Sequence, residues 1–274
     1  EGPPGVGKTE LANTASLYFK KEMIRLQCYE GLDESKALYE WRYGKQLLYT
    51  QILKEQMQEV LEGAKGLKES LDRLMKFEDI FFSEDFLETR PLLEALTSKK
   101  GSVLLIDEVD KSDEEFEALL LEILSEFQIS IPELGVRKAN VKPLVILTSN
   151  NSREIGDALK RRCLHLYIPF PDAKLERQIV QARVPEISES MQIQLVNFVQ
   201  GIRELDLKKL PAISETIDWA KTVILLNSEE LDAKLAEDTL NVLLKHQQDI
   251  EVVKKEIPAL VSSATETSDG KSIN

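Results

Sequence analysis

A short glycine-rich stretch at 2–9 carries residue types that could bind a polyphosphate. It spells GPPGVGKT and fits the pattern G-x-x-x-x-G-K-[ST] of phosphate-binding loops. Glycines let the backbone turn through positive φ, so that successive N–H groups can converge on phosphate oxygens. Lys8 adds a positive charge for the β- and γ-phosphates, and the Thr9 hydroxyl is a candidate Mg²⁺ ligand. The predicted nucleotide-binding residues are Gly2, Pro3, Pro4, Gly5, Val6, Gly7, Lys8, Thr9 and Glu10.

The residues around this loop indicate a helix after it and a strand before it. The run TELANTASLYFK is helical in pattern, so its N-terminal dipole would also face the anion. A phosphate-binding loop normally follows a buried strand. Because the sequence opens at Glu1, directly before the loop, we expect a chain cut at its N-terminus and lacking that strand. Expressed alone, such a chain is expected to aggregate or to bind ATP weakly.

The segment SVLLIDEVDKSD predicts the metal and water chemistry that would accompany the loop. Val103–Ile106 is a continuous apolar run, which is typical of a strand buried on both faces. Asp107 at its end would hold Mg²⁺, mostly through water, and Glu108 would orient and polarise the attacking water. An Asp-Glu pair by itself is more often a solvated turn. The apolar run and the upstream loop favour the functional interpretation here.

Two further segments could contribute to the same chemistry. The apolar run Leu144–Thr148 predicts a strand, and Asn150 just after it could hold the lytic water or the γ-phosphate. A turn-forming role is the alternative, and it fits Asn151 better than Asn150. The pair Arg161 and Arg162 precedes another predicted strand, Leu164–Ile168. Basic residues at a helix end often only complement the helix dipole.

The remaining pattern divides the chain into an α/β part and a helical part. Met23–Tyr29 predicts a strand, 34–75 is helical in period, and 128–140 resembles a hairpin. After Pro171 only helical periods follow, which suggests a second, smaller domain. We therefore expect an α/β nucleotide-binding core with a parallel sheet over 1–170, a small all-helical domain over 171–249, and a polar, partly disordered tail over 250–274.

Composition limits the classes of partner. The 274 residues are 42% hydrophobic, which supports a real core, and no apolar run is long enough to span a membrane. A net charge of −13 and a pI of about 4.9 make duplex DNA and anionic membranes poor partners. Cys28 and Cys163 are expected to be buried thiols, and the sequence shows no clustered zinc ligands. A cytoplasmic protein fits this pattern.

The order of these motifs resembles that of an AAA+ ATPase, and local detail narrows the resemblance. The segments EGPPGVGKTELA, SEDFLETRPLLEAL, LLIDEVDKSDEEFEALLLEILSEFQISIPELG, TSNNSREIGDALKRRCLHLYIPFP and SETIDWAK together resemble the MoxR family, most closely its CoxD-like branch. The resemblance covers the chain from Glu1 to about Asp249. Its first two motifs occur in many ATPases, whereas 148–171 and 214–221 are the more specific parts.

The resemblance implies a P-loop αβα sandwich with strand order 5-1-4-3-2, a helical lid and a ring oligomer, with a hexamer as the expected ring. It makes ATP and Mg²⁺ the cofactors and Asn150 the γ-phosphate sensor. Arg162, with Arg161 as second choice, would act as an arginine finger in the neighbouring subunit. An insert is implied within Tyr49–Ile80. One departure is Glu215, which stands about where many lids place an arginine.

The partners implied by the resemblance are a protein with a von Willebrand factor A domain and a metal-containing client enzyme, such as one of the carbon monoxide dehydrogenase type. The implied activity is ATP-driven remodelling or maturation of that client. Two other functions stay open at this point. One is a nucleic-acid motor, against which the charge of −13 argues. The other is a nucleotide-gated scaffold that hydrolyses ATP poorly.

Overall fold

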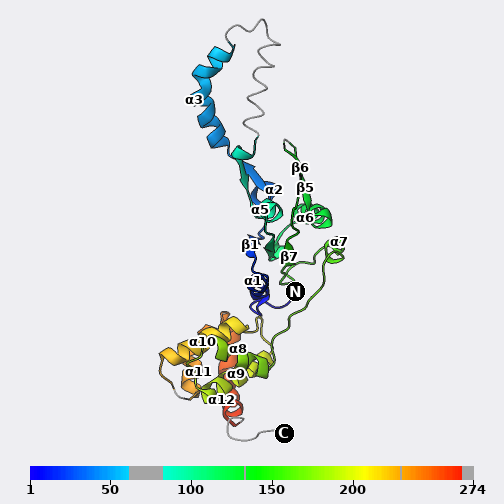
Figure 1. The fold of residues 1–274 in the computed structure, drawn as a ribbon. Coiled ribbons are helices and arrows are strands. Elements are labelled where there is room, and N and C mark those ends of the chain that lie inside the picture. Colours follow the sequence, from blue (N-terminus) through cyan, green and yellow to red (C-terminus); the bar gives the residue numbers. More distant parts are fainter. Residues whose placement is uncertain (62–82, 133, 229, 267–274) are drawn as a thin grey trace. The chain divides into compact units, whose positions relative to one another are not determined.

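A computed structural model describes residues 1–61, 83–132, 134–228 and 230–266 (Figure 1). The chain forms two compact units. The first contains Glu1 and the chain from Thr9 to Leu166. The second contains the loop Gly2–Lys8 and the chain from Tyr167 onward.

A parallel three-stranded sheet with order β1-β4-β7 is the centre of the first unit. Leu105 of β4 pairs with Arg25 of β1 and Ile146 of β7, and every residue of β4 is buried. The three strands end at the same edge, so the residues that follow them lie close together. The elements of this unit are α1 Lys8–Phe19, β1 Glu22–Gln27, α2 Glu34–Ala37, β2 Tyr39–Trp41, α3 Tyr43–Leu61, η1 Glu84–Phe86, β3 Leu87–Thr89, α5 Pro91–Thr97, β4 Ser102–Asp107, η2 Val109–Lys111, α6 Glu114–Glu126, β5 Gln128–Ile131, β6 Gly135–Lys138, β7 Leu144–Leu147 and α7 Asp157–Lys160.

Helices cover both faces of this sheet because the apolar side chains of β4 alternate between the faces. Val103 and Leu105 pack with Ala12 of α1 on one face. Leu104 and Ile106 join a larger cluster with α5 and α6 on the other. Burying each such side chain contributes about 1.5–3 kcal/mol. The α/β fold class predicted from the sequence, a parallel sheet between helices, is confirmed.

The first unit also contains two small antiparallel strand pairs, and one of them shows an error in the sequence prediction. The hairpin of β5 and β6 lies within the predicted 128–140. The helical prediction over 34–75 is wrong at 39–41, where β2 pairs with β3. That partner comes from far along the chain, and local periodicity cannot report it. Most of the predicted insert Tyr49–Ile80 lies outside the described residues, although α3 includes its first part.

The predicted strand Leu164–Ile168 is not a strand in this structure. Leu164 and Leu166 are 102% and 56% exposed. In the expected strand order, this segment pairs only with a strand that precedes the phosphate loop, and the described residues contain none there. The α-amino group of Glu1 donates to the Leu166 carbonyl at 2.7 Å, but a single hydrogen bond does not form a ladder.

The second unit is a helical bundle, as expected (Figure 1). It is packed around Phe198 and Trp219, whose rings lie 5.2 Å apart. A polar, partly disordered tail was expected over 250–274, but residues 250–266 belong to the helix α12, Gln247–Glu266. Val253, Ile257 and Ala264 recur at helical spacing and are buried, so this segment is part of the bundle. Residues 267–274 lie outside the described part. The helices are α8 Ala173–Arg183, α9 Glu189–Arg203, α10 Ile213–Leu225, α11 Ala233–Leu243 and α12 Gln247–Glu266.

Among the described residues, no helix combines the length and apolar character needed to cross a bilayer. Both cysteines are free thiols. Cys28 is buried, as expected, whereas Cys163 is only partly buried.

Candidate functional site

The phosphate-binding loop has the backbone shape that its glycines predict. Gly2, Gly5 and Gly7 all have positive φ, of 149°, 73° and 96°. A Cβ atom at Gly2 would lie 2.2 Å from the Ile168 carbonyl oxygen, so that position has no room for a side chain. The Lys8 ammonium donates to the carbonyls of Gly2 and Pro3 at 2.8 and 2.7 Å. Two carbonyl groups of the loop therefore bind the ammonium of the loop's own lysine.

The other predicted loop residues are more open. Glu10 accepts from the Asn13 side chain at 3.2 Å on the exposed side of α1. Its carboxylate is therefore engaged with its own helix. Three loop residues are exposed, Pro4, Gly5 and Gly7, and two are partly buried, Pro3 and Val6.

The start of α10 packs against the loop within the second unit. A Cβ atom at Gly5 would lie 2.6 Å from the Ala212 Cβ and 2.7 Å from the Ser214 hydroxyl oxygen. The Glu215 carboxylate accepts from the Ala212 N–H at 3.1 Å and from the Ser214 hydroxyl at 2.9 Å. Glu215 therefore caps the helix that touches the loop.

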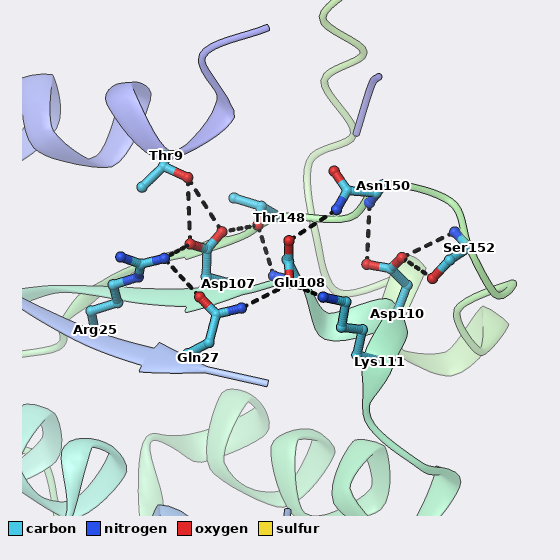
Figure 2. A network of polar contacts seen from close by, with 10 residues as sticks. All are labelled: Thr9, Arg25, Gln27, Asp107, Glu108, Asp110, Lys111, Thr148, Asn150 and Ser152. Atoms are coloured by element: carbon cyan, nitrogen blue, oxygen red, sulfur yellow. Dashed lines mark hydrogen bonds and ion pairs between the residues drawn. The ribbon is translucent and has the colours of Figure 1, made fainter. Parts of the chain in front are cut away.

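The Thr9 hydroxyl and the Asp107 carboxylate lie close together at the sheet edge of the first unit. The Thr9 hydroxyl lies 3.4 Å from each carboxylate oxygen of Asp107 (Figure 2). Asp107 also accepts from the Thr148 hydroxyl and pairs with the Arg25 guanidinium, both at 2.5 Å. Hydroxyl and carboxylate oxygens suit Mg²⁺, and Arg25 shows that this carboxylate takes a cation. The residues present therefore fit the predicted metal.

Glu108 begins a sharp turn after β4 and is held from several sides. Its backbone is left-handed, with φ 57° and ψ 49°, which costs a non-glycine residue about 1–2 kcal/mol. Its Oε1 accepts from the Asn150 amide at 3.2 Å (Figure 2). Its Oε2 accepts from the Gln27 amide at 3.0 Å and pairs with the Lys111 ammonium at 2.5 Å. That hydrogen bond raises the pKa of Lys111.

The two adjacent asparagines differ in conformation. Asn150 turns its side chain to Glu108, whereas Asn151 has a left-handed backbone with φ 57°. Asp107, Glu108, Asn150 and Thr9 thus come together from α1, the end of β4 and the end of β7.

Several residues of this network were not predicted from the sequence as site residues. Arg25 and Gln27 alternate with the buried Ile24 and Leu26 at the carboxyl end of β1. Polar side chains at the end of a strand adjoining the Asp-Glu strand were the available signal. The other members not predicted as site residues are Asp110, Lys111, Thr148 and Ser152.

Arg161 and Arg162 do not belong to this network in the structure. Both are exposed at the end of α7. Arg162 donates from Nε to the Ser125 hydroxyl at 3.1 Å and from Nη1 to the Ala158 carbonyl at 3.1 Å. Their role across a subunit interface stays a prediction.

One family model and several solved structures are similar to this chain. The family described as AAA domain (dynein-related subfamily) matches residues 1–163. Among solved structures, two RuvB mutants and the RuvB Holliday junction branch migration motor, all from Thermotoga maritima, are 16–17% identical, with TM-scores of 0.47–0.49. The alignments cover 88–96% of this chain and 60–72% of those chains. This chain therefore spans only 60% of the length of the first of them. No curated protein matches.

Proposed function

Since the chain belongs to the dynein-related subfamily of AAA domains, we propose that it binds ATP with Mg²⁺ and hydrolyses it. The arrangement of Glu108 supports this most directly. Its carboxylate follows the metal-ligating Asp107 and lies 3.2 Å from the Asn150 amide. A candidate base and a candidate polar sensor therefore share one edge of the sheet with Thr9.

Each residue has a distinct part in the proposed reaction. The loop N–H groups and Lys8 bind the phosphates, and Thr9 and Asp107 would hold Mg²⁺, which when bound neutralises charge on the phosphate oxygens. Glu108 accepts a proton from the attacking water, whose oxygen bonds to the γ-phosphorus as the bond to the ADP oxygen breaks. Asn150 orients the water or the γ-phosphate. Arg162 of a neighbouring subunit would stabilise charge in the transition state.

A nucleotide-gated scaffold that hydrolyses poorly is the second candidate, and the Lys111 ion pair favours it. The Lys111 ammonium lies 2.5 Å from Oε2 and so occupies one of the two carboxylate oxygens that could face the attacking water. If this pair persists with ATP bound, turnover is slow. Replacing Lys111 by Met separates the two candidates, because it should raise turnover only where the ion pair limits the rate.

The finer assignment also follows the resemblance. We propose a MoxR-type protein of the CoxD-like branch that forms a ring, acts in the cytoplasm and remodels a metal-containing client enzyme. Its second partner would be a protein with a von Willebrand factor A domain. The network around Glu108 supports the ATPase step of this proposal. The partners rest on the quoted motifs alone.

Glu108→Gln is the decisive variant. It keeps the size of the side chain and should keep ATP binding, while turnover falls by about 100-fold or more. Calorimetry measures binding, and phosphate release measures turnover. Near-normal turnover would remove Glu108 from its proposed role. The same variant, held in its ATP state, is the bait for capturing a ring partner or client. Lys8→Ala is the matched variant, which should bind ATP more weakly and capture less of the client.

A further inference from the structure

Asp110 is a buried carboxylate that holds the loop after β7. It lies in η2, two residues after Glu108, and is 3% exposed. Its Oδ1 accepts from the Asn150 N–H at 3.1 Å, and its Oδ2 accepts from the Ser152 N–H at 3.0 Å and from the Ser152 hydroxyl (Figure 2). Donors from two residues of one loop thus converge on a single side chain.

The loop is shaped for an anion. The left-handed Asn151 separates Asn150 from Ser152, and the N–H groups of those two residues both point at Asp110. The Asn151 N–H is directed elsewhere, to the Ser149 hydroxyl at 3.0 Å. Alternating backbone N–H groups that converge in this way form an anion-binding nest. Here the anion is a side chain of the protein. Burial raises the pKa of Asp110, but the hydrogen bonds from Ser152 and Asn150 outweigh burial, and the pKa is lowered overall.

This anchor closes a small ring of residues. Asp110 fixes the backbone of Asn150, and the Asn150 side chain donates to Glu108 at 3.2 Å. In the sequence, only Val109 separates Glu108 from Asp110, so the backbone completes the ring. The distance between the Asn150 amide and the Glu108 carboxylate is therefore set by the Asp110 contact as well as by β4 and β7.

We propose that Asp110 is a positioning residue, which acts through Asn150 to align the sensor amide with Glu108 for hydrolysis. This inference rests on the proposed ATPase function. Asp110 touches neither nucleotide nor water in this role. Its loss should lower kcat and leave ATP binding nearly unchanged.

Asp110→Asn is the primary test because it keeps the shape and removes the charge. An amide can accept at only one of its two ends, so part of the nest loses its partner. We expect kcat to fall by about 10–100-fold, as is common when a supporting contact is lost. The KM for ATP should stay within about twofold, since the loop Gly2–Lys8 is unchanged. Asp113→Asn is the matched control, because Asp113 only caps α6 by accepting from the Phe116 N–H at 2.9 Å.

A double-mutant cycle separates positioning from general stability. If Asp110 acts through Asn150, Asp110→Asn should add almost nothing to the kcat loss of Asn150→Ala. Multiplying effects would mean that the two residues act independently and would overturn the inference. Hydrogen exchange without nucleotide should also be faster at Asn150 and Ser152 in Asp110→Asn, and unchanged exchange would equally overturn it.

Two further comparisons complete the design. Should Asp110→Asn fail to fold, Ser152→Ala removes one donor to the same oxygen and should lower kcat in the same non-additive way. An active Asp110→Asn protein beside an active wild type would overturn this inference alone. A wild-type protein without Mg²⁺-dependent turnover would overturn the proposed function and the inference together.

Discussion

Replacing Arg203 by Met should strongly destabilise the helical unit, because Arg203 neutralises a fully buried carboxylate. Glu176 of α8 is 0% exposed, and the Arg203 side chain is 6% exposed. The guanidinium donates to both carboxylate oxygens, at 2.6 and 2.8 Å. Thr216 and Gln200 donate to the same carboxylate at 2.8 and 2.7 Å. Arg203→Met leaves this charge without its counter-ion.

The magnitude follows from this geometry. Removing one partner of a buried, hydrogen-bonded ion pair costs about 3–5 kcal/mol, because the remaining charge stays buried. Typical domains have total stabilities of about 5–15 kcal/mol, so this is a large share. The loss extends towards the phosphate-binding loop. Arg203 also donates to the Pro211 carbonyl at 2.9 Å, directly before Ala212, which packs on Gly5. We therefore expect weaker ATP binding as a second consequence.

Urea unfolding followed by tryptophan fluorescence measures the effect. The chain has two tryptophans, so Trp41→Phe leaves Trp219 of α10 as the single reporter. Lys254→Met is the control, since its ion pair with Glu237 is exposed at 3.0 Å and should contribute about 0–1 kcal/mol. If Arg203→Met loses no more stability than Lys254→Met, the buried-pair reasoning is refuted. Replacing Glu176 and Arg203 together by apolar residues should cost less than Arg203→Met alone.

Four other outcomes are expected. Lys8→Ala should weaken ATP binding by about 10–100-fold in calorimetry, because a charge-assisted contact worth about 1.5–3 kcal/mol is lost; unchanged affinity would exclude this loop. Arg162→Ala subunits should bind ATP yet hydrolyse it about 1,000-fold more slowly, and mixing them with Lys8→Ala subunits should restore some turnover. No rescue in verified mixed rings would contradict action across subunits. Burial and the nearby carboxylate charges, chiefly that of Asp107, raise the pKa of Cys28 to about 12, so mass spectrometry after alkylation at pH 8 should find Cys163 modified well before Cys28. Asp110, whose pKa is lowered on folding, stabilises the fold above its unfolded pKa of about 3.9, and this contribution is lost as pH falls through the folded pKa. Acid titration should therefore show less pH dependence in Asp110→Asn, and an unchanged titration curve would contradict it.

The sequence predicted the parts of the fold whose signals are local. The apolar run before Asp107 could only be a buried strand, and the phosphate-binding loop specified its own backbone through its glycines. Asn150 was predictable because a polar residue after a buried strand lies at the same sheet edge as Asp107. The roles of these residues in hydrolysis remain predictions.

The errors concern segments whose structure depends on a distant partner. β2 needs β3, and Leu164–Ile168 needs a neighbouring strand that the described residues do not supply. An apolar strand-like segment without a partner leaves its N–H and C=O groups unpaired, so composition alone does not make it a strand. The prediction for the C-terminal segment was wrong in the opposite sense, because a segment expected to be a tail is helical as far as Glu266. Its buried apolar residues, such as Val253 and Ile257, fall on one helical face, and that face packs into the bundle.

Buried carboxylates that bind backbone N–H groups explain why the polar network was harder to predict than the sheet. Asp110 binds the N–H groups of Asn150 and Ser152, and Glu117 of α6 accepts from the Gly156 N–H at 2.9 Å further along that loop. In the second unit, Asp249 binds two consecutive N–H groups, at 208 and 209, at 2.9 and 3.2 Å. These carboxylates are all buried, and each binds backbone N–H groups of a loop. A solvated acidic residue and a buried loop anchor have the same letter in the sequence. The difference appears only when the fold brings the backbone donors to the carboxylate, as the pairing of β4 with β7 does for Asp110.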